Sequence, residues 1–172
     1  MKFPTPILDT ERLQLTKLTL HDAPFILSLL NDPAWLQHIG DRGVNNLDDA
    51  RSYILDGPLR SYAQRGFGLY LTRLKDGNVP IGLCGLLKRE SLPHVDIGFA
   101  FLPDYRGKGY AYEAATAVLH YGHTTLGLKH LIGIVSPENP DSIRLLTKLG
   151  LRYEKMVQLE DGTHCQLFSQ KT

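Results

Sequence analysis

The order of hydrophobic and polar residues along this chain predicts strands that alternate with helices. Residues 13–18 alternate apolar and polar side chains, which is typical of a strand with one buried face. Residues 131–135 are instead a short continuous apolar run, as expected of a strand buried on both faces. By the same patterns and the turn residues between them, the other predicted strands are residues 67–74, 79–87, 95–101, 153–159 and 164–169.

Helical spacing of apolar residues marks most of the segments between these strands. Asn46 is a good N-cap for the longest predicted helix, and Gly57-Pro58 predicts an interruption or kink inside it. Asn139-Pro140 marks the start of the last helix and Gly150 its end. The predicted helices are residues 23–30, 47–65, 111–122 and 139–149, while residues 34–45 are expected to be a loop or a broken helix.

The order of these elements predicts an α/β fold. The strands on either side of the short turn at residues 75–78 should be antiparallel neighbours. Strands interrupted by helices then form a mixed, predominantly antiparallel sheet with helices on both faces. At 172 residues the chain is long enough to bury a sizeable core, and we expect residues 1–172 to form a single domain.

The most informative stretch is residues 94–122, which predict a strand, a turn, a basic loop and a helix with a narrow face of small side chains. Arg106, Gly107, Lys108, Gly109 and Tyr110 stand directly before that helix. A helix N-terminus has unpaired N–H groups and a partial positive charge, and the glycines let the backbone approach a ligand. With the added charge of the two basic side chains, the loop predicts a pyrophosphate-binding cradle.

The sequence motifs of two other phosphate-binding loops do not match this stretch. A Walker-type loop needs Gly-Lys-Ser/Thr, but Gly107-Lys108 is followed by Gly109. A dinucleotide fingerprint needs a third small residue where this chain has Tyr112. An alternative stays open, namely that the glycines serve the turn between strand and helix and nothing else.

Composition and charge exclude some classes of protein. A net charge of +1 argues against broad nucleic-acid binding. The N-terminal residues contain no apolar run of the signal-peptide kind, and no stretch has the length of a membrane span. The only cysteines, Cys84 and Cys165, have no metal-type spacing, so we expect a cytoplasmic protein with free thiols and no metal.

The remaining pattern, Arg-x-x-Gly-x-Ala at residues 106–111, resembles the acetyl-CoA signature of the GNAT acetyltransferase superfamily. The predicted order of elements is that of the GNAT fold, with the cradle after the fourth strand, so the resemblance covers nearly the whole chain. Residues 10–13 (Thr-Glu-Arg-Leu) and 138–142 (Glu-Asn-Pro-Asp-Ser) resemble the branch of ribosomal-protein N-terminal acetyltransferases of the Rim type.

The resemblance implies acetyl-CoA as co-substrate and a set of positions that bind it. In the family the strand before the cradle splays from the next one, and the pantetheine arm pairs with the exposed backbone. By resemblance these positions are Phe99, Ala100 and Phe101. The pyrophosphate would then meet the N–H groups of residues 106–111, from Arg106 to Ala111, and Asn139 would bond the amide arm. Asn139 is also a helix N-cap, which is the alternative role.

Asp96 is the ionisable residue inside the central strand, and it matches by position the glutamate that several GNAT enzymes use as general base. The alternative is that Asp96 points into solvent or into an ion pair. Glu90 and His94, at the mouth of the same strand, are the other candidates for the base. By resemblance Ser142 lies near the sulfur and provides a hydrogen bond, or relays a proton to the leaving thiolate.

Several other chemically active residue types are expected to be structural. His120 and His123 lie three apart on a helix without an evident third metal ligand, and both are expected to be exposed. Cys84 is expected to be a buried small apolar residue. Four aromatic residues are expected to divide between the acceptor pocket and the core, and the sequence does not say which two lie in the core. They are Trp35, Tyr53, Tyr62 and Phe67.

The resemblance implies an N-acetyltransferase that moves an acetyl group to a primary amine by direct attack on the thioester. The alternatives are a non-catalytic acyl-CoA-binding module, and another phosphate-ligand protein that reuses the loop. The acceptor is a protein N-terminal α-amine or a small-molecule amine, and the sequence does not choose between them. Two copies pairing through the last strands would follow the family analogy.

Overall fold

One eight-stranded sheet runs through the computed structural model, which describes residues 5–170. The strands lie side by side in the order β1-β2-β3-β4-β5-β6-β8-β7, and β5 and β6 are the parallel pair among otherwise antiparallel neighbours. The predicted mixed, mostly antiparallel sheet is therefore confirmed. The bounds are β1 Leu8–Asp9, β2 Leu13–Lys17, β3 Leu69–Leu74, β4 Val79–Leu87, β5 Val95–Phe101, β6 Leu131–Val135, β7 Arg152–Gln158 and β8 His164–Ser169.

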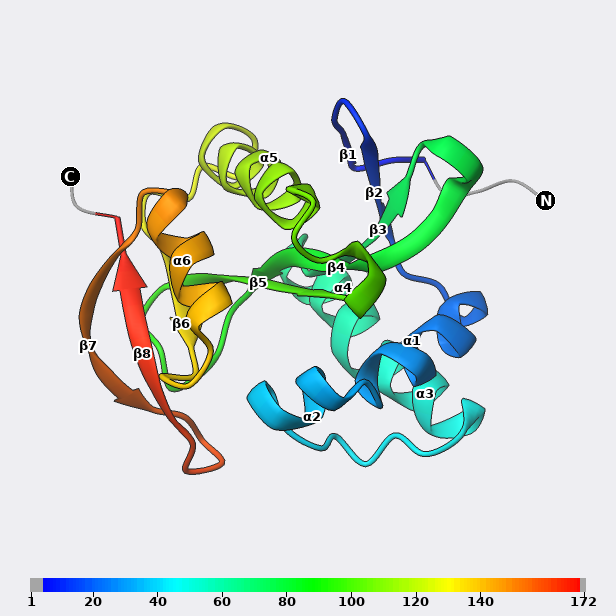
Figure 1. Cartoon of the computed structure of the whole chain (residues 1–172), viewed down its shortest axis with the longest axis horizontal. Coiled ribbons are helices and arrows are strands. Elements are labelled where there is room, and N and C mark those ends of the chain that lie inside the picture. Colours follow the sequence, from blue (N-terminus) through cyan, green and yellow to red (C-terminus); the bar gives the residue numbers. More distant parts are fainter. Residues whose placement is uncertain (1–4, 171–172) are drawn as a thin grey trace.

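Helices cover both faces of this sheet, as predicted (Figure 1). On one face lie α1 (Ala23–Leu30), α2 (Pro33–His38), α3 (Leu47–Ile54) and α4 (Arg60–Arg65). On the other face lie α5 (Tyr110–Thr124) and α6 (Pro140–Lys148). The sheet is thus a middle layer, and each face has its own apolar cluster.

The small-residue face of α5 is buried as the sequence predicted. Ala114, Ala115 and Val118 are fully covered by the larger of the two clusters, which also contains β5 side chains. A Cβ atom on Gly122 would lie 2.9 Å from a methyl group of Leu131, so the last turns of α5 approach β6 closely. Small side chains on one helix face therefore set how near α5 lies to the sheet.

Local capping explains where several helices begin. The Asn46 side chain accepts a hydrogen bond from the Asp49 N–H at 2.8 Å, and Asn139 accepts one from the Ser142 N–H at 3.2 Å. Between α3 and α4 the chain does not break at Gly57-Pro58 but forms a π-helical turn, Leu55–Leu59. A proline has no N–H to donate, and this wider turn accommodates it within a continuous helical path.

The sequence left residues 34–45 open as a loop or a broken helix, and it did not predict β1. Residues 33–38 form a short helix, because Asp32 caps it and Pro33 occupies its first position. The two-residue strand β1 is too short to give a periodic pattern, and it exists through its pairing with β2.

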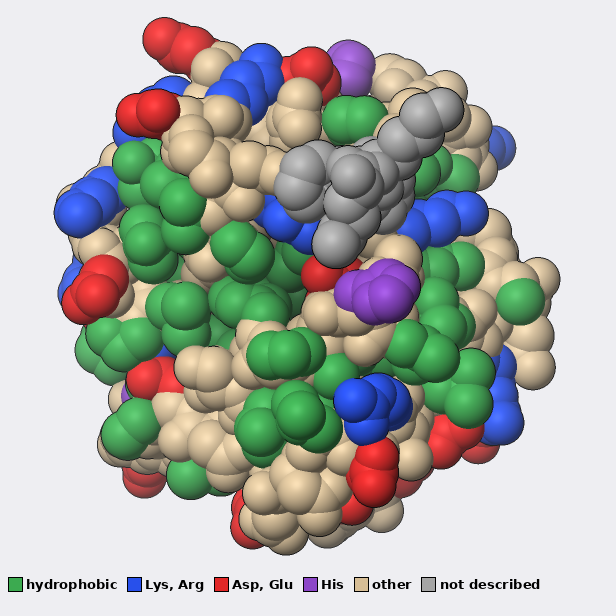
Figure 2. Space-filling model, turned by 90° about the vertical axis from the view of Figure 1, so that its right-hand side faces the viewer, with side chains coloured by type: hydrophobic (Ala, Val, Ile, Leu, Met, Phe, Trp, Pro, Cys, Tyr) green, Lys and Arg blue, Asp and Glu red, His purple; other side chains and the backbone are tan. Residues whose placement is uncertain are grey.

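No helix among residues 5–170 is long and apolar enough to cross a membrane. On the face beside the N-terminus, acidic and basic side chains are scattered between hydrophobic ones (Figure 2). The charges of the described residues on that face therefore form no broad patch of one sign.

Candidate active site

β5 and β6 separate after only three paired residues, and the two strands then form a fork. The parallel register runs through Val95↔Leu131, Asp96↔Ile132 and Ile97↔Gly133. The rest of β5 pairs with β4 alone among the described strands. One edge of β5 after Ile97 therefore presents backbone groups to the fork, where an extended molecule could pair with them.

The three predicted cofactor positions on β5 lie on this part of the strand. Phe99 and Ala100 are half-buried, whereas the Phe101 side chain belongs to the core. The Phe101 carbonyl already accepts a hydrogen bond from Arg106 Nε at 2.9 Å. The backbone of Phe99 and Ala100 is thus the more available part of the predicted site.

The loop before α5 has the open backbone that a cradle needs. Gly107 and Gly109 have φ angles of 72° and 84°, a region that side-chain-bearing residues rarely adopt. No backbone or side-chain hydrogen bond takes the N–H groups of residues 107–111 within the described part of the chain. These N–H groups, at the start of a 15-residue helix, are suited to bind an anion.

Arg106 differs from the predicted role. Its N–H donates to the Pro103 carbonyl at 3.2 Å, so it is not among the free donors of the cradle. Its guanidinium donates to Phe101 O and to Asp32 Oδ2, the latter at 2.8 Å. The Arg106 charge is therefore directed away from the loop, whereas Lys108 remains exposed beside it.

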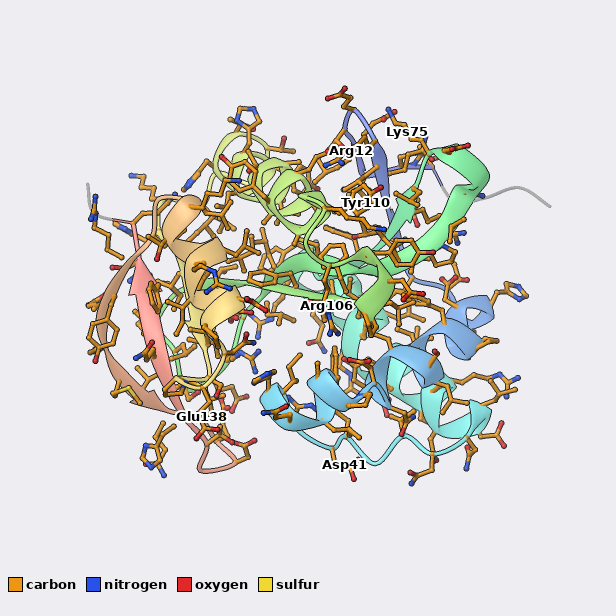
Figure 3. The ribbon with its side chains drawn as sticks, viewed as in Figure 1. Arg12, Asp41, Lys75, Arg106, Tyr110 and Glu138 are labelled. Atoms are coloured by element: carbon orange, nitrogen blue, oxygen red, sulfur yellow. The ribbon has the colours of Figure 1, made fainter. Side chains whose placement is uncertain are left out.

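The N-terminal segment holds the cradle from the other side. Glu113, in the first turn of α5, accepts hydrogen bonds from the Thr10 hydroxyl, the Arg12 N–H and Arg12 Nε. The Arg12 guanidinium also donates to the Lys108 carbonyl at 3.1 Å and covers the Tyr110 ring at 4.4 Å from its centroid (Figure 3). Partial burial acts to raise the pKa of Glu113, but these hydrogen bonds outweigh it and lower the pKa.

The contacts around Glu113 account for two residues of the Thr-Glu-Arg-Leu stretch. The motif itself was visible in the sequence, but its partner on α5, more than a hundred residues away, was not.

Asp96 is buried at the base of the fork, with a side chain that is 1% exposed. It lies 3.3 Å from Arg89 Nε, although these two buried atoms have no hydrogen-bond partner among the described residues. Burial raises the pKa of Asp96 to about 6, and the Arg89 charge limits the rise. Of the alternatives weighed from the sequence, exposure to solvent is excluded and an ion pair is found.

Asp96 faces the α1–α4 side of the sheet. Its register partner on β4 is Leu87, and paired residues on antiparallel strands share a face. Val95 and Ile97 point the opposite way, into the cluster under α5. Glu90 and His94, the other candidates for a base, are exposed.

The N-terminus of α6 brings Asn139 and Ser142 together. Asn139 is the predicted N-cap, and its cofactor role stays a prediction. The Ser142 side chain is half-buried, and its hydroxyl makes no hydrogen bond within the described residues.

Comparison with known proteins decides the family. The sequence matches the acetyltransferase (GNAT) domain over residues 12–152. The chain belongs to the GNAT acetyltransferase family. It is 31% identical to the uncharacterized N-acetyltransferase p20 of Bacillus licheniformis over 154 residues, which are 87% of this chain and 84% of that protein.

Solved structures share the fold over nearly the whole chain. The match to an acetyltransferase from Agrobacterium tumefaciens C58 covers 100% of this chain and 98% of that protein, with a TM-score of 0.82 and 24% identity. RimL, a ribosomal α-N-protein acetyltransferase solved with coenzyme A, covers 96% of this chain and 97% of its own at a TM-score of 0.80 and 16% identity. The GNAT fold is confirmed, and its neighbours include a Rim-type enzyme. The protein is a GNAT N-acetyltransferase.

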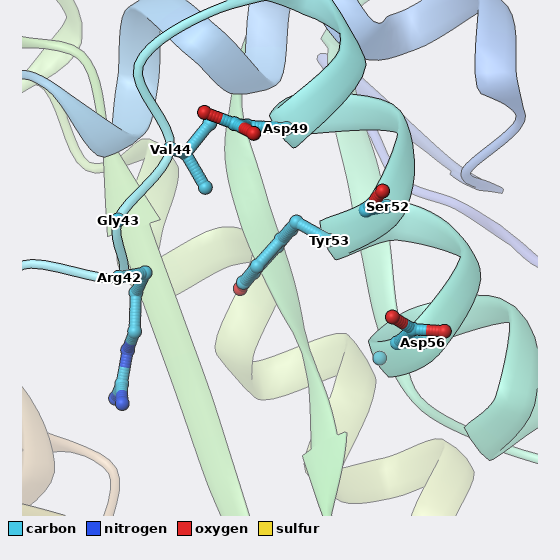
Figure 4. A pocket seen from close by; sticks show the side chains of 8 residues that line it. Arg42, Gly43, Val44, Asp49, Ser52, Tyr53 and Asp56 are labelled. Carbon is cyan, nitrogen blue, oxygen red and sulfur yellow. The ribbon is translucent and has the colours of Figure 1, made fainter.

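Two hollows lie on the α1–α4 side of the acetyltransferase, and Tyr53 lines both. The first, about 410 Å³, lies between Arg42 and α3, and Tyr53 projects from α3 into it (Figure 4). The second, about 260 Å³, lies between α4 and the strand residues Leu69 and Leu87. Because Leu87 is the register partner of Asp96, this hollow and the Asp96 carboxylate share one side of the sheet.

The four aromatic residues divide between core and surface. Trp35 and Phe67 are buried in the two apolar clusters. The Tyr62 hydroxyl bonds the backbone of Leu18 and Leu69, which gives it a structural role. Tyr53 is the member that reaches the hollows.

Of the residues expected to be structural, Cys84 and His120 lie as predicted, whereas His123, predicted to be exposed, is half-buried. Cys84 is fully buried and free, and burial raises the pKa of its thiol. Both ring nitrogens of His123 have oxygen partners, on Leu128 and Gln170. His120 is exposed on α5.

Proposed function

We propose that this acetyltransferase uses acetyl-CoA to acetylate a primary α-amine by direct attack, with Asp96 as general base. One observation carries the proposal: Asp96 lies one residue before the end of the β5–β6 pairing. A buried carboxylate therefore stands at the base of the fork whose far end leads into the phosphate cradle.

The residues present fit the co-substrate. The N–H groups of Gly107, Lys108, Gly109, Tyr110 and Ala111 would hold the pyrophosphate. The unpaired edge at Phe99 and Ala100 would hold the pantetheine arm, with Asn139 on the other side of the fork. Acetyl-CoA, when bound, supplies the acetyl group as an activated thioester. A β5 N–H group in the fork would polarise the carbonyl of that group.

The proton that the base removes is held less tightly by an α-amine than by an alkylamine. An α-ammonium group has a pKa of about 8 and an alkylammonium group a pKa of about 10, so any base deprotonates the α-ammonium group at less cost. We therefore propose a protein N-terminus or a free amino acid as the acceptor rather than a polyamine. Ser142 is the proposed donor of a hydrogen bond or a relayed proton to the leaving thiolate.

Turnover across a matched panel of acceptors tests this function. Free thiol is followed with acetyl-CoA and peptides with free N-termini, the same peptides with blocked N-termini and one lysine, amino acids, polyamines and aminoglycosides. We expect turnover with free α-amines that is lost in Asp96→Ala while CoA still binds. Preference for a blocked peptide or a polyamine would contradict the α-amine assignment. CoA binding without any turnover would favour the non-catalytic alternative.

The cytoplasmic location, the single domain and the pairing of two copies stay predictions. Two free and buried cysteines, Cys84 and Cys165, suit a reducing compartment.

A further inference from the structure

The Arg106 side chain joins three parts of the molecule that are far apart in sequence. Its Nε donates to the carbonyl of Phe101 at the end of β5, at 2.9 Å. Its terminal nitrogen Nη2 donates to Asp32 Oδ2 at 2.8 Å, and Asp32 is 74 residues away. Gly107, the next residue, starts the run of free N–H groups in the cradle. In Figure 3, Arg106 lies between the loop after β5 and α2.

Asp32 is the residue that holds α2 in place. Its Oδ2 also accepts from the N–H groups of Ala34 and Trp35, at 3.1 and 3.4 Å. The side chain is 7% exposed, so these bonds are shielded from water. A helix of six residues has little stability of its own, and α2 therefore depends on this cap and on the burial of Trp35.

α2 in turn borders the acceptor side of the sheet. Trp35 belongs to the same apolar cluster as Ala100, a predicted cofactor position, and Val44, which lines the larger hollow. A displacement of Arg106 would thus act on α2 through one charged hydrogen bond, and on the donor edge of β5 through another.

We infer that Asp32 is a positioning residue which, through Arg106, couples occupancy of the phosphate cradle to the order of α2. The inference rests on the proposed function, because it takes the cradle to bind CoA. A ligand that fixes the backbone at residues 107–111 also fixes Arg106, and Arg106 then holds the Asp32 carboxylate in its capping position. Donor binding thereby orders one wall of the acceptor side.

Two substitutions separate this coupling from the cap itself. Asp32→Asn keeps a side-chain oxygen for the Ala34 and Trp35 N–H groups, since asparagine is as good an N-cap as aspartate. It removes the charge that Arg106 binds. Arg106→Gln removes the guanidinium from the other end and leaves the cap untouched. Asp48→Asn, in an exposed ion pair with Arg51, is the matched control.

Hydrogen exchange of the full-length protein with and without CoA is the test. In the wild-type protein and in Asp48→Asn, CoA should slow exchange of the α2 amides by about fivefold or more, the usual range of a coupling between sites. In Asp32→Asn and Arg106→Gln the slowing should fall below about twofold. The exchange rates of the α3 amides should change little when CoA is added. Without CoA, the exchange rates of the α2 amides in Asp32→Asn should be close to those of the wild-type protein.

The outcomes that overturn the inference are distinct. Equal slowing in wild-type and Asp32→Asn proteins would show that CoA orders α2 by another path. CoA binding to the wild-type protein with no slowing at α2 would show that no coupling exists. Failure of the wild-type protein to bind CoA would overturn the proposed cofactor site, and the inference with it.

Discussion

The α5 side of the sheet and the α1–α4 side contribute different kinds of group to the site. On the α5 side the groups are backbone: free N–H groups in a glycine loop and the unpaired edge of β5. On the α1–α4 side they are side chains: Asp96 with Arg89 on that face of the sheet, and Tyr53 in the hollows. In the proposed function, the backbone groups would bind the co-substrate that the family shares, and the side chains would distinguish one acceptor from another.

Asp96→Asn should produce the largest effect on activity, and it should lower kcat without changing CoA affinity. Loss of a general base typically lowers kcat by about a hundredfold or more. The CoA dissociation constant should stay within about twofold, because the amide leaves β5 and the cradle unchanged. Steady-state kinetics and calorimetry check both, with Asp48→Asn as the exposed control. A parallel loss of CoA affinity would mean that the two sides are not separable.

The pH dependence of Asp96 gives the second prediction. Its native pKa of about 6 lies above the ordinary 3.8, so the native state binds more protons between these values and loses stability as pH rises through them. The cost of ionising Asp96 is then at most about 3 kcal/mol at pH 7. Activity should instead fall as pH drops below about 6, because the base becomes protonated.

Thermal denaturation at several pH values checks the predicted loss of stability as Asp96 ionises. Asp96→Asn should have a Tm equal to or above that of the wild-type protein at pH 7, and the difference should shrink toward pH 4. A Tm of the variant that falls instead at pH 7 would show that the Arg89 pair contributes more than the burial costs.

Gly107→Ala addresses the backbone side and has an intermediate effect. Gly107 has a φ of 72° with nothing within 4 Å of an added Cβ, and Gly127, outside the site, has a φ of 68° with equally open space. Both substitutions should lower stability by about 1 kcal/mol, because both place a side chain at positive φ. Only Gly107→Ala should weaken CoA binding, by about tenfold. Equal CoA affinities would remove the cradle assignment.

Glu113→Gln should give the smallest effect. The amide keeps acceptor capacity for the Thr10 hydroxyl but loses the charge that binds Arg12. The loop before α5 should loosen, and CoA affinity should fall by about fivefold, which corresponds to about 1 kcal/mol. Isothermal titration of CoA measures it. No change would mean that the cradle holds its shape without the N-terminal segment.

Prediction from sequence succeeded where the determining interactions are local. The strands 79–87, 95–101, 131–135 and 164–169 have the observed bounds, because periodicity and turn residues fix them. The positive-φ loop before α5 was predictable for the same reason, since glycine spacing at a helix start is a local signal, while its role as a cradle stays a prediction. Helix α2 was left open between a loop and a broken helix, because its cap and its buried Trp35 matter only once α1 has placed them.

The long-range side-chain pairs could not be predicted. Arg106 and Asp32, or Arg12 and Glu113, become partners only through the folded sheet, and nothing near either residue names the other. The burial of Asp96 could not be predicted either. The alternation of side chains along the strand indicates which face of the sheet Asp96 lies on, but not what covers that face. The sequence therefore predicted the backbone conformation of the candidate site but not the partners of its side chains.

The short β5–β6 pairing also has a mechanical consequence. Within the sheet, three residue pairs join strands β1–β5 to strands β6–β8, and the apolar cluster under α5 packs against both blocks. A molecule bound in the fork would bridge both blocks and add its binding free energy to the cost of separating them. CoA should therefore raise the cooperativity of unfolding as well as the Tm, and the C-terminal block should open first without it.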